Sequence, residues 1–234
     1  MTSLPRKTFR PARSGSLLTL ALGLSLGAVP SSRAQSPDAI IERAASVWSN
    51  VRTVQGTFEQ TVSNPLTGST ARSHGTYAQQ RPNHLAIHFS SPGSDAVVAD
   101  GTNLWIYLPS SAPGQVIKRR ATERGSAPID LTGQFLDSPR TRYDASAAGT
   151  RTIDGHAAHG VTLAPKDGTS SPFTRATVWV DDDDSLIRAF DETEPSGVTR
   201  SVHLTTVKLD APIDRGTFRF AIPKGARIVD QTKG

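Results

Sequence analysis

The sequence predicts a mainly β protein in which one curved antiparallel sheet of ten or eleven strands is covered by two helical segments. Three observations lead to this prediction. Apolar residues follow a helical period just after residue 36, they alternate with polar residues almost everywhere beyond residue 53, and one irregular apolar stretch interrupts the strands at 128–137. A sheet of this size closes, splits or leaves an opening, so the helical segments are its natural lid.

The first helical segment begins at Ser36-Pro37-Asp38, which supplies an N-cap residue, a proline at the first helical position and an acidic residue in the first turn. The apolar residues that follow recur at helical spacing: Ile40, Ala44, Val47, Trp48 and Val51. We therefore expect an amphipathic helix over about 37–51. The second segment, Pro128–Asp137, is too irregular for a strand and suits one or two short helical turns.

The expected strands follow one another at short spacing and show no domain break. They begin at 54–63, continue with 73–80 and 84–90 on either side of Arg81-Pro82, and end at 217–222. We therefore expect residues 35–234 to form a single domain.

Residues 1–34 have the three parts of a secretory signal. Four basic residues precede an apolar run at 16–29, and Ser32-Arg33-Ala34 supplies the small residues that a signal peptidase reads. The apolar run is too short to cross a bilayer with confidence. We expect cleavage after Ala34 and export of a soluble chain.

Charge and cysteine content exclude several kinds of function. The leader carries five of the 26 Lys and Arg residues and none of the 21 Asp and Glu residues, which leaves 21 basic against 21 acidic residues. A neutral chain gives no reason to expect nucleic-acid or anionic-membrane binding. The chain has no cysteine, which excludes thiolate chemistry, disulfides and acylation of an amino-terminal cysteine. We expect a protein that is not itself a lipoprotein.

The polar clusters do not predict a metal site or a cofactor. The run Asp181–Asp184 lacks the alternating ligands and the glycine of a calcium loop, so a solvated hairpin turn is favoured. His84 and His88 share a strand face, and His156 and His159 lie in a glycine-flanked turn, but neither pair has a third ligand at a familiar spacing. For these histidines we expect ordinary surface positions.

An enzyme is not favoured by the motifs present. The chain has no Gly-x-Ser-x-Gly elbow and no phosphate-binding loop. A catalytic pair of carboxylates cannot be chosen among 21 acidic residues without geometry. The sequence therefore favours a non-enzymatic protein.

Two features have two interpretations each. The aromatic residues on predicted strands either fill an ordinary core or line a ligand cavity that the sheet is too wide to fill: Phe58, Phe89, Trp105, Tyr107, Trp179 and Phe190. Arg81 stands before Pro82, at the start of a strand whose apolar side chains alternate onto one face. It is either a solvated arginine or a donor to backbone carbonyls of a covering element, and physical chemistry alone leaves both open.

Five stretches of the sequence carry a resemblance to a known family. They are VQGTFEQ at 54–60, GTYAQQRPN at 75–83, VVADGTNLWIYLP at 97–109, QVI at 115–117 and FRFAIPKG at 218–225. Together they resemble the LolA family of periplasmic outer-membrane lipoprotein carriers, and the similarity covers essentially all of residues 35–234. The combination of Arg-Pro with a later Asp-Gly-x-x-Leu-Trp is fairly specific.

The resemblance implies an unclosed, eleven-stranded antiparallel β-barrel with helices as a lid over an apolar cavity. Members of the family take acylated lipoproteins from the inner-membrane transporter LolCDE, shield their acyl chains in the periplasm, and pass them to an outer-membrane receptor such as LolB. It further implies a carrier without enzymatic activity or cofactor, and a monomer is the simplest expectation.

Carried onto this sequence, the resemblance gives Arg81 the role of holding the lid. The residues expected to line the acyl-chain cavity are Phe58, Leu85, Ile87, Phe89, Trp105, Tyr107, Leu131, Phe135, Trp179 and Phe190. One position departs from the family: four residues after the arginine, where well-known members carry an aromatic residue, this chain has Leu85. Two rival functions are a lipid-binding sensor of envelope stress with the same fold and a periplasmic lipid-processing enzyme.

Overall fold

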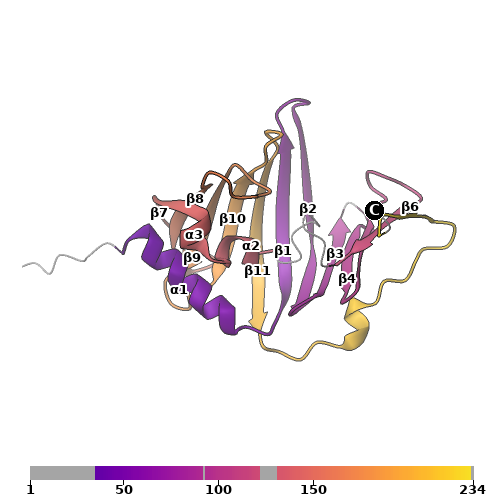
Figure 1. Cartoon of the computed structure of the whole chain (residues 1–234), viewed down its shortest axis with the longest axis horizontal. Helices are drawn as coiled ribbons and strands as arrows, with labels where there is room; N and C mark the ends of the chain where they lie inside the picture. Colours follow the sequence, from indigo (N-terminus) through magenta and orange to yellow (C-terminus); the bar gives the residue numbers. More distant parts are fainter. Residues whose placement is uncertain (1–34, 92, 122–130, 233–234) are drawn as a thin grey trace, which may run out of the picture. The chain divides into compact units, whose positions relative to one another are not determined.

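A computed structural model describes residues 35–91, 93–121 and 131–232, so the expected leader and residues 128–130 lie outside the described residues. The described elements appear in Figure 1. In chain order they are α1 (Pro37–Asn50), β1 (Thr53–Asn64), β2 (Ser69–Gln80), β3 (His84–Ser91), β4 (Ala96–Asp100), β5 (Asn103–Tyr107), β6 (Gln115–Arg120), α2 (Gly133–Leu136), α3 (Pro139–Arg142), β7 (Tyr143–Ile153), β8 (His156–Pro165), β9 (Arg175–Asp181), β10 (Ile187–Thr193), β11 (Thr199–Leu209), the 3₁₀ turn η1 (Arg215–Phe218) and β12 (Arg227–Asp230).

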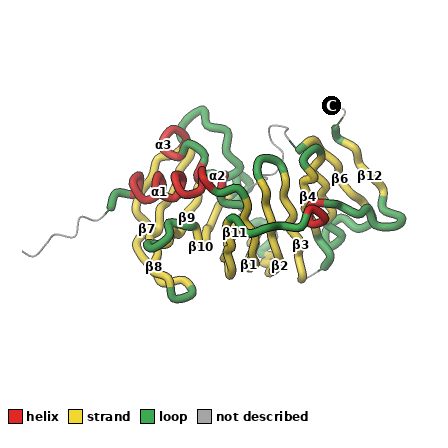
Figure 2. Tube along the Cα trace, turned by 90° about the horizontal axis from the view of Figure 1, so that it is seen from below, coloured by secondary structure: helices red, strands yellow, loops and turns green. Residues whose placement is uncertain are grey.

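The described strands form one sheet in the order β12-β6-β5-β4-β3-β2-β1-β11-β10-β9-β8-β7. Strands β7 and β12 are the two edges and do not pair with each other, so the sheet curls without closing (Figure 2). The predicted fold class, a mainly β unclosed sheet with a few short helices, is confirmed.

Two details of the predicted sheet are wrong. The segment expected as a strand at 217–222 does not join the sheet: it begins within η1 and continues as irregular chain. A twelfth strand instead forms at Arg227–Asp230, and it pairs with β6 in parallel, whereas every other neighbouring pair is antiparallel.

Helix α1 begins and ends close to the predicted positions. The Ser36 side chain caps it by accepting a hydrogen bond from the N–H of Ala39 at 3.3 Å, and Pro37 follows at the first helical position. Its buried residues are Ile40, Ile41, Ala44 and Trp48, which form one stripe. Figure 1 shows α1 lying with α2 and α3 against the β7–β11 half of the sheet. None of the helices in the described ranges is long and apolar enough to cross a membrane.

The main apolar core lies on the face of the sheet that carries the helices. It joins residues of α1 and α2 to the inward-facing residues of the strands. A smaller cluster lies on the opposite face, where Phe218 of η1 packs with Ala86 and Val98. The sheet thus has apolar side chains on both faces, which we call the inner face, under the helices, and the outer face.

Strand β1 is pressed closely against β11. A Cβ atom added at Gly56 would lie 1.9 Å from the backbone oxygen of Thr206, so no other residue fits there without moving the strands. A β-bulge follows between Thr57 and Phe58, and bulges increase local twist. These features help the sheet to curl around the inner face.

Candidate functional site

The candidate site is the apolar interior between the helices and the inner face of the sheet. Helix α1 contributes the residues of its buried stripe, and α2 contributes Phe135 and Leu136. The sheet opposes them with large apolar side chains, among them Phe58, Leu85, Ile87, Phe190, Val202 and Leu204. Since polar groups are few on both layers, only an apolar ligand could replace these contacts without loss.

Aromatic contacts attach α2 to the sheet. The ring of Phe135 is fully buried, and its centroid lies 5.0 Å from that of Phe190 and 5.4 Å from that of Phe173. A second pair, Phe58 and Phe89, meets edge to face at 5.4 Å further along the sheet. Tilted and edge-on rings at these separations attract one another beyond their buried area.

The interior is nearly filled in this closed form. It holds a cavity of about 20 Å³, which is room for about one water molecule. The lining residues come from α1, α2 with the residues just before it, and the sheet: Ala44, Trp48, Val54, Tyr77, Gln79, Leu131, Thr132, Leu136, Ser185, Leu186, Ile187, Leu204 and Val207. The cavity has no room for a ligand larger than about one water molecule in this conformation.

A crevice of about 390 Å³ lies beside this cavity, at the end of β2. Its walls come from α1, from the β2–β3 turn and from α2: Ala45, Trp48, Ser49, Gln79, Arg81, Pro82, Gly133, Leu136 and Asp137. The crevice and the cavity share Trp48, Gln79 and Leu136. These three side chains therefore separate the apolar interior from the surface.

Arg81 stands at this crevice, in the turn that follows β2. Its backbone N–H donates to the carbonyl oxygen of Arg52 at 3.0 Å, which fixes the turn against the end of α1. Its guanidinium carbon lies 4.8 Å from the centre of the Trp48 ring, a cation–π contact with helix α1. Arg81 therefore touches the lid, and the lid-holding role remains a prediction that this contact supports.

Seven of the ten residues predicted for the cavity belong to the inner core or pack against it: Phe58, Leu85, Ile87, Phe89, Leu131, Phe135 and Phe190. The structure brings these residues together on the inner face. Contact between them and an acyl chain remains a prediction.

The other three predicted residues lie on the outer face, contrary to prediction. Trp105 stacks on Phe220 at 5.7 Å and Tyr107 lies 6.3 Å from the same ring. Trp179 packs against a small outer cluster and lies under the guanidinium of Arg151. The physical reason is strand alternation, because their neighbours along the chain point into the inner core.

Sequence reasoning missed the polar residues of the lining. Tyr77 and Gln79 both point inward from β2 and are buried. Burial raises the pKa of Tyr77, whose hydroxyl lies 3.4 Å from the backbone oxygen of Thr206. The alternation of side chains along β2 could have placed both residues on the inner face. A glutamine, however, does not by itself indicate an apolar cavity.

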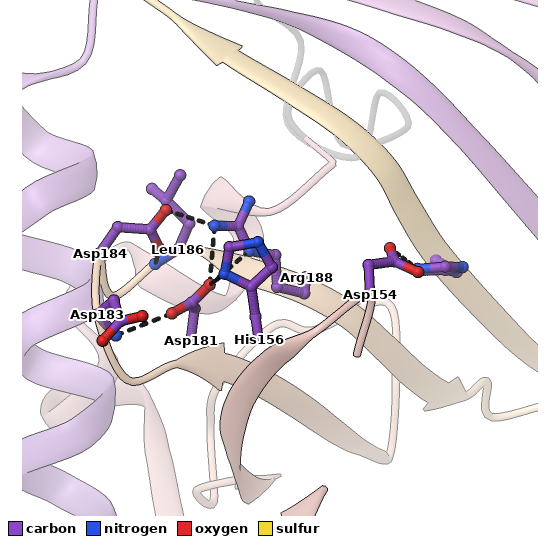
Figure 3. A network of polar contacts seen from close by, with 8 residues as sticks. Asp154, His156, Asp181, Asp183, Asp184, Leu186 and Arg188 are labelled. Carbon is purple, nitrogen blue, oxygen red and sulfur yellow. Dashed lines mark hydrogen bonds and ion pairs between the residues drawn. The ribbon is translucent and has the colours of Figure 1, made fainter. Parts of the chain in front are cut away.

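The acidic run at the β9–β10 turn has a structural role that the sequence did not predict (Figure 3). Asp181 is 0% exposed, accepts a hydrogen bond from Arg188 Nε at 2.8 Å and lies 2.8 Å from His156 Nδ1. A solvated turn is therefore the wrong description for Asp181, although the three residues after it are exposed. His156 is therefore in contact with a buried carboxylate, and Nδ1 of His159 contacts Asp182.

Spacing alone would let one group of described residues hold a metal ion, namely His156, Asp181 and Asp183, whose ligand atoms lie within 4.8 Å of one another. Arg188 already supplies positive charge to this group through its bonds to Asp181 and Asp184. The buried Asp181 carboxylate is neutralised by the Arg188 guanidinium. We therefore interpret the arrangement as an ion-pair network that fixes the turn.

The fold and the site together define a class of protein in which an unclosed sheet, with helices over its inner face, surrounds an apolar interior. Such a protein is suited to enclosing an apolar ligand. The chain matches the family model described as outer membrane lipoprotein carrier protein LolA over residues 49–221, and it belongs to that family. The family predicted from the sequence is thereby confirmed, and its description names a carrier.

Similar proteins agree with this assignment. The chain is 28% identical over 219 residues to an outer-membrane lipoprotein carrier protein of Halorhodospira halophila, covering 93% of this chain and 95% of the relative. It is 27% identical over 215 residues to one of Shewanella frigidimarina, covering 92% and 94%. An uncharacterized conserved protein from Thermus thermophilus has a similar fold, with a TM-score of 0.53, 14% identity, and coverage of 84% of this chain and 100% of that one.

Proposed function

We propose that this protein carries acylated lipoproteins across the periplasm. Residues 1–34 direct its export, it takes lipoproteins released by the inner-membrane transporter LolCDE, and it delivers them to LolB or an equivalent outer-membrane receptor. The acyl chains lie between the helices and the inner face of the sheet. The observation that carries the proposal is an apolar interior that, in the described part of the chain, is covered by side chains of α1 and α2, in a chain that belongs to a carrier family.

Loading requires the helices to leave the sheet. Trp48, Phe135 and Leu136 fill the space that the acyl chains would take. Apolar contacts are non-directional, so an acyl chain replaces the contacts that the helices give up. The crevice beside Arg81 adjoins the interior and is the natural place for opening to begin.

The energetics of such a carrier must be balanced. Each buried methylene contributes roughly 0.8 kcal/mol, so full enclosure of several acyl chains would contribute tens of kcal/mol and prevent release. The lost contacts between helices and sheet offset part of this gain, and so does incomplete coverage of the chains. Transfer then needs no nucleotide on the carrier, because a receptor with somewhat higher affinity is sufficient.

A release assay tests the proposal. Spheroplasts that display newly made lipoprotein are incubated with the purified protein lacking residues 1–34, and the supernatant is examined for a soluble one-to-one complex. The matched control is the same lipoprotein without its acylated cysteine. We expect release of the acylated form alone. If neither form is released, the proposed function is wrong, and sensing or processing of free lipids becomes the better interpretation of the fold.

A further inference from the structure

A buried carboxylate faces helix α2 from the sheet. Glu192 lies two residues after Phe190 on β10, so both side chains point to the inner face. Phe190 contacts Phe135 of α2, and Glu192 is only 8% exposed. A carboxylate in such a place needs partners, because burial of an unpaired charge is costly.

The two polar partners of Glu192 make long contacts with its carboxylate oxygens. Gln134 of α2 donates from Nε2 to Glu192 Oε2 at 3.4 Å, and Arg200 Nε lies 3.5 Å from Glu192 Oε1. The backbone oxygen of Gln134 accepts from the hydroxyl of Tyr143 at 2.7 Å and from Arg142 at 3.4 Å. Gln134 therefore links α2 to β10 and to β7 by polar contacts.

Two buried atoms of this cluster lack a hydrogen-bond partner. Within the described ranges, three buried side-chain polar atoms are unsatisfied, and two of them are Gln134 Oε1 and Arg200 Nε. An ionised carboxylate can only accept hydrogen bonds, so it cannot satisfy Gln134 Oε1. A protonated carboxyl group has an O–H that can donate to this oxygen, while Arg200 keeps Glu194 as a charged partner.

We propose that Glu192 is a second lid-positioning residue, which acts on α2 through Gln134 and holds it more tightly when its carboxyl group carries a proton. This inference rests on the proposed function, in which α2 is part of a lid that opens. It concerns a different part of the lid from Arg81, which contacts α1. The lid then has two separately held parts, and one of them responds to pH.

The direction of the pH response follows from burial. Burial raises the pKa of Glu192 and outweighs the charge of Arg200 and the hydrogen bond from Gln134, which both lower it, while the charge of Glu194 adds to the rise. Arg142 and Tyr143 face the same cluster through Gln134. When α2 opens, water reaches Glu192 and its pKa falls towards the ordinary value, so the closed form binds more protons. Closure is therefore favoured at low pH and weakens as pH rises through the raised pKa.

Hydrogen exchange of α2 amides in the protein without lipoprotein tests this inference. The reporters are the N–H groups of Phe135 and Asp137, which donate to Thr132 and Gly133. After correction for the intrinsic effect of pH, we expect their opening to increase between about pH 4 and pH 8. In Glu192→Gln the side chain is an amide that stays neutral and can donate to Gln134. The opening of α2 should then no longer depend on pH, and its equilibrium constant at neutral pH should be roughly fivefold smaller than in wild type, which corresponds to one net hydrogen bond.

Glu194→Gln is the matched control, since Glu194 also pairs with Arg200 but makes no contact with Gln134 among the described interactions. It should keep a pH dependence of wild-type size, shifted to lower pH because the charge of Glu194 no longer raises the pKa of Glu192, and the α1 amide of Ile40 should be unchanged in both variants. A wild-type profile that is flat with pH, or a Glu192→Gln profile equal to wild type, would overturn the inference. Since no lipoprotein is present, this result is independent of the release assay, and each can fail alone.

Discussion

Trp48 is the residue on which the contacts of the lid converge. Its side chain is 8% exposed, it lines both the internal cavity and the surface crevice, and its ring receives the guanidinium of Arg81. An arginine keeps its charge at any physiological pH, so this contact does not depend on proton concentration. In the proposed carrier, Arg81 would therefore restrain α1 equally at every physiological pH, in contrast to the pH-dependent restraint proposed for Glu192 on α2.

Replacing Arg81 with leucine should weaken closure. The variant loses a partly buried cation–π contact of about 1 kcal/mol, which favours the open form by roughly fivefold. We expect it to load lipoprotein at least as well as wild type but to unload more slowly, because the closed form no longer competes with the cargo. The measurement is the rate of transfer from a preformed complex to outer membranes that contain the receptor.

The control for this substitution is Arg72→Leu, an exposed arginine near the start of β2, the strand that ends just before Arg81. It should transfer lipoprotein at the wild-type rate. Equal rates for all three proteins would contradict the lid-holding role of Arg81.

The placement of Trp105 shows where residue-level prediction reached its limit. Strand β5 has apolar side chains on both faces: Leu104 points inward, and Trp105 and Tyr107 point outward to Phe220. When both sets are apolar, alternation alone cannot tell which faces the core. Strand β3 was predictable because its large apolar side chains, Leu85, Ile87 and Phe89, all share one face, and the residues that alternate with them are small or polar.

At the scale of elements, the β9–β10 hairpin carries its own ion-pair network. Burial alone would raise the pKa of Asp181, but hydrogen bonds from the Asp183 N–H and from Arg188, with the charges of Arg188 and His156, outweigh it and hold the pKa below its usual range. The network fixes the turn whose residues Ser185, Leu186 and Ile187 line the internal cavity. Its integrity therefore shapes one wall of the candidate site.

Asp181→Asn should destabilise the protein by about 1–3 kcal/mol at pH 7, because the Arg188 guanidinium loses its buried partner and keeps the exposed Asp184. A depressed pKa contributes stability above the unfolded pKa of about 4, and this stability is lost as pH falls through the folded pKa. The difference in unfolding free energy between wild type and variant should thus shrink on acidification. Urea unfolding at neutral pH and at about pH 3 measures it.

Asp183→Asn is the control, because the exposed Asp183 side chain can change while its backbone N–H still donates to Asp181. The unfolding free energy of this variant should lie within about 0.5 kcal/mol of that of wild type. A loss of similar size in both variants would show that the turn, rather than the buried carboxylate, determines stability.

The elements that could be predicted are those with strong local patterns, such as α1 with its cap and apolar stripe. The prediction of a strand at 217–222 was wrong for a physical reason. Phe218, Phe220 and Ile222 alternate like a strand, but extended chain alternates whether or not it pairs, and here the two phenylalanines pack on the outer face. Strand β12 has four residues and a parallel partner, and neither property leaves a local pattern.

At the scale of the whole described domain, the sheet and the helices differ in how they are held. The strands are joined by continuous hydrogen-bonded ladders, and contacts as close as that at Gly56 leave them no room to shift. The helices are attached mainly by apolar side chains and by the contacts of Arg81 and Gln134. Loading should therefore move the helices and leave the sheet unchanged.

The central claim is that acyl chains lie between the helices and the inner face of the sheet. It is tested most directly by placing a photoreactive benzoyl-phenylalanine at position 89, which is Phe89 on the inner face, or at position 105, which is Trp105 on the outer face. Both native side chains are partly buried aromatics, so the two variants are matched. Each variant is loaded with acylated lipoprotein, irradiated, and analysed for the attached chain.

The account predicts attachment of the acyl chains at position 89, little at position 105, and none with lipoprotein that lacks its acylated cysteine. Attachment at position 105 with none at position 89 would contradict it, because the acyl chains would then lie on the outer face and the lid would not enclose them.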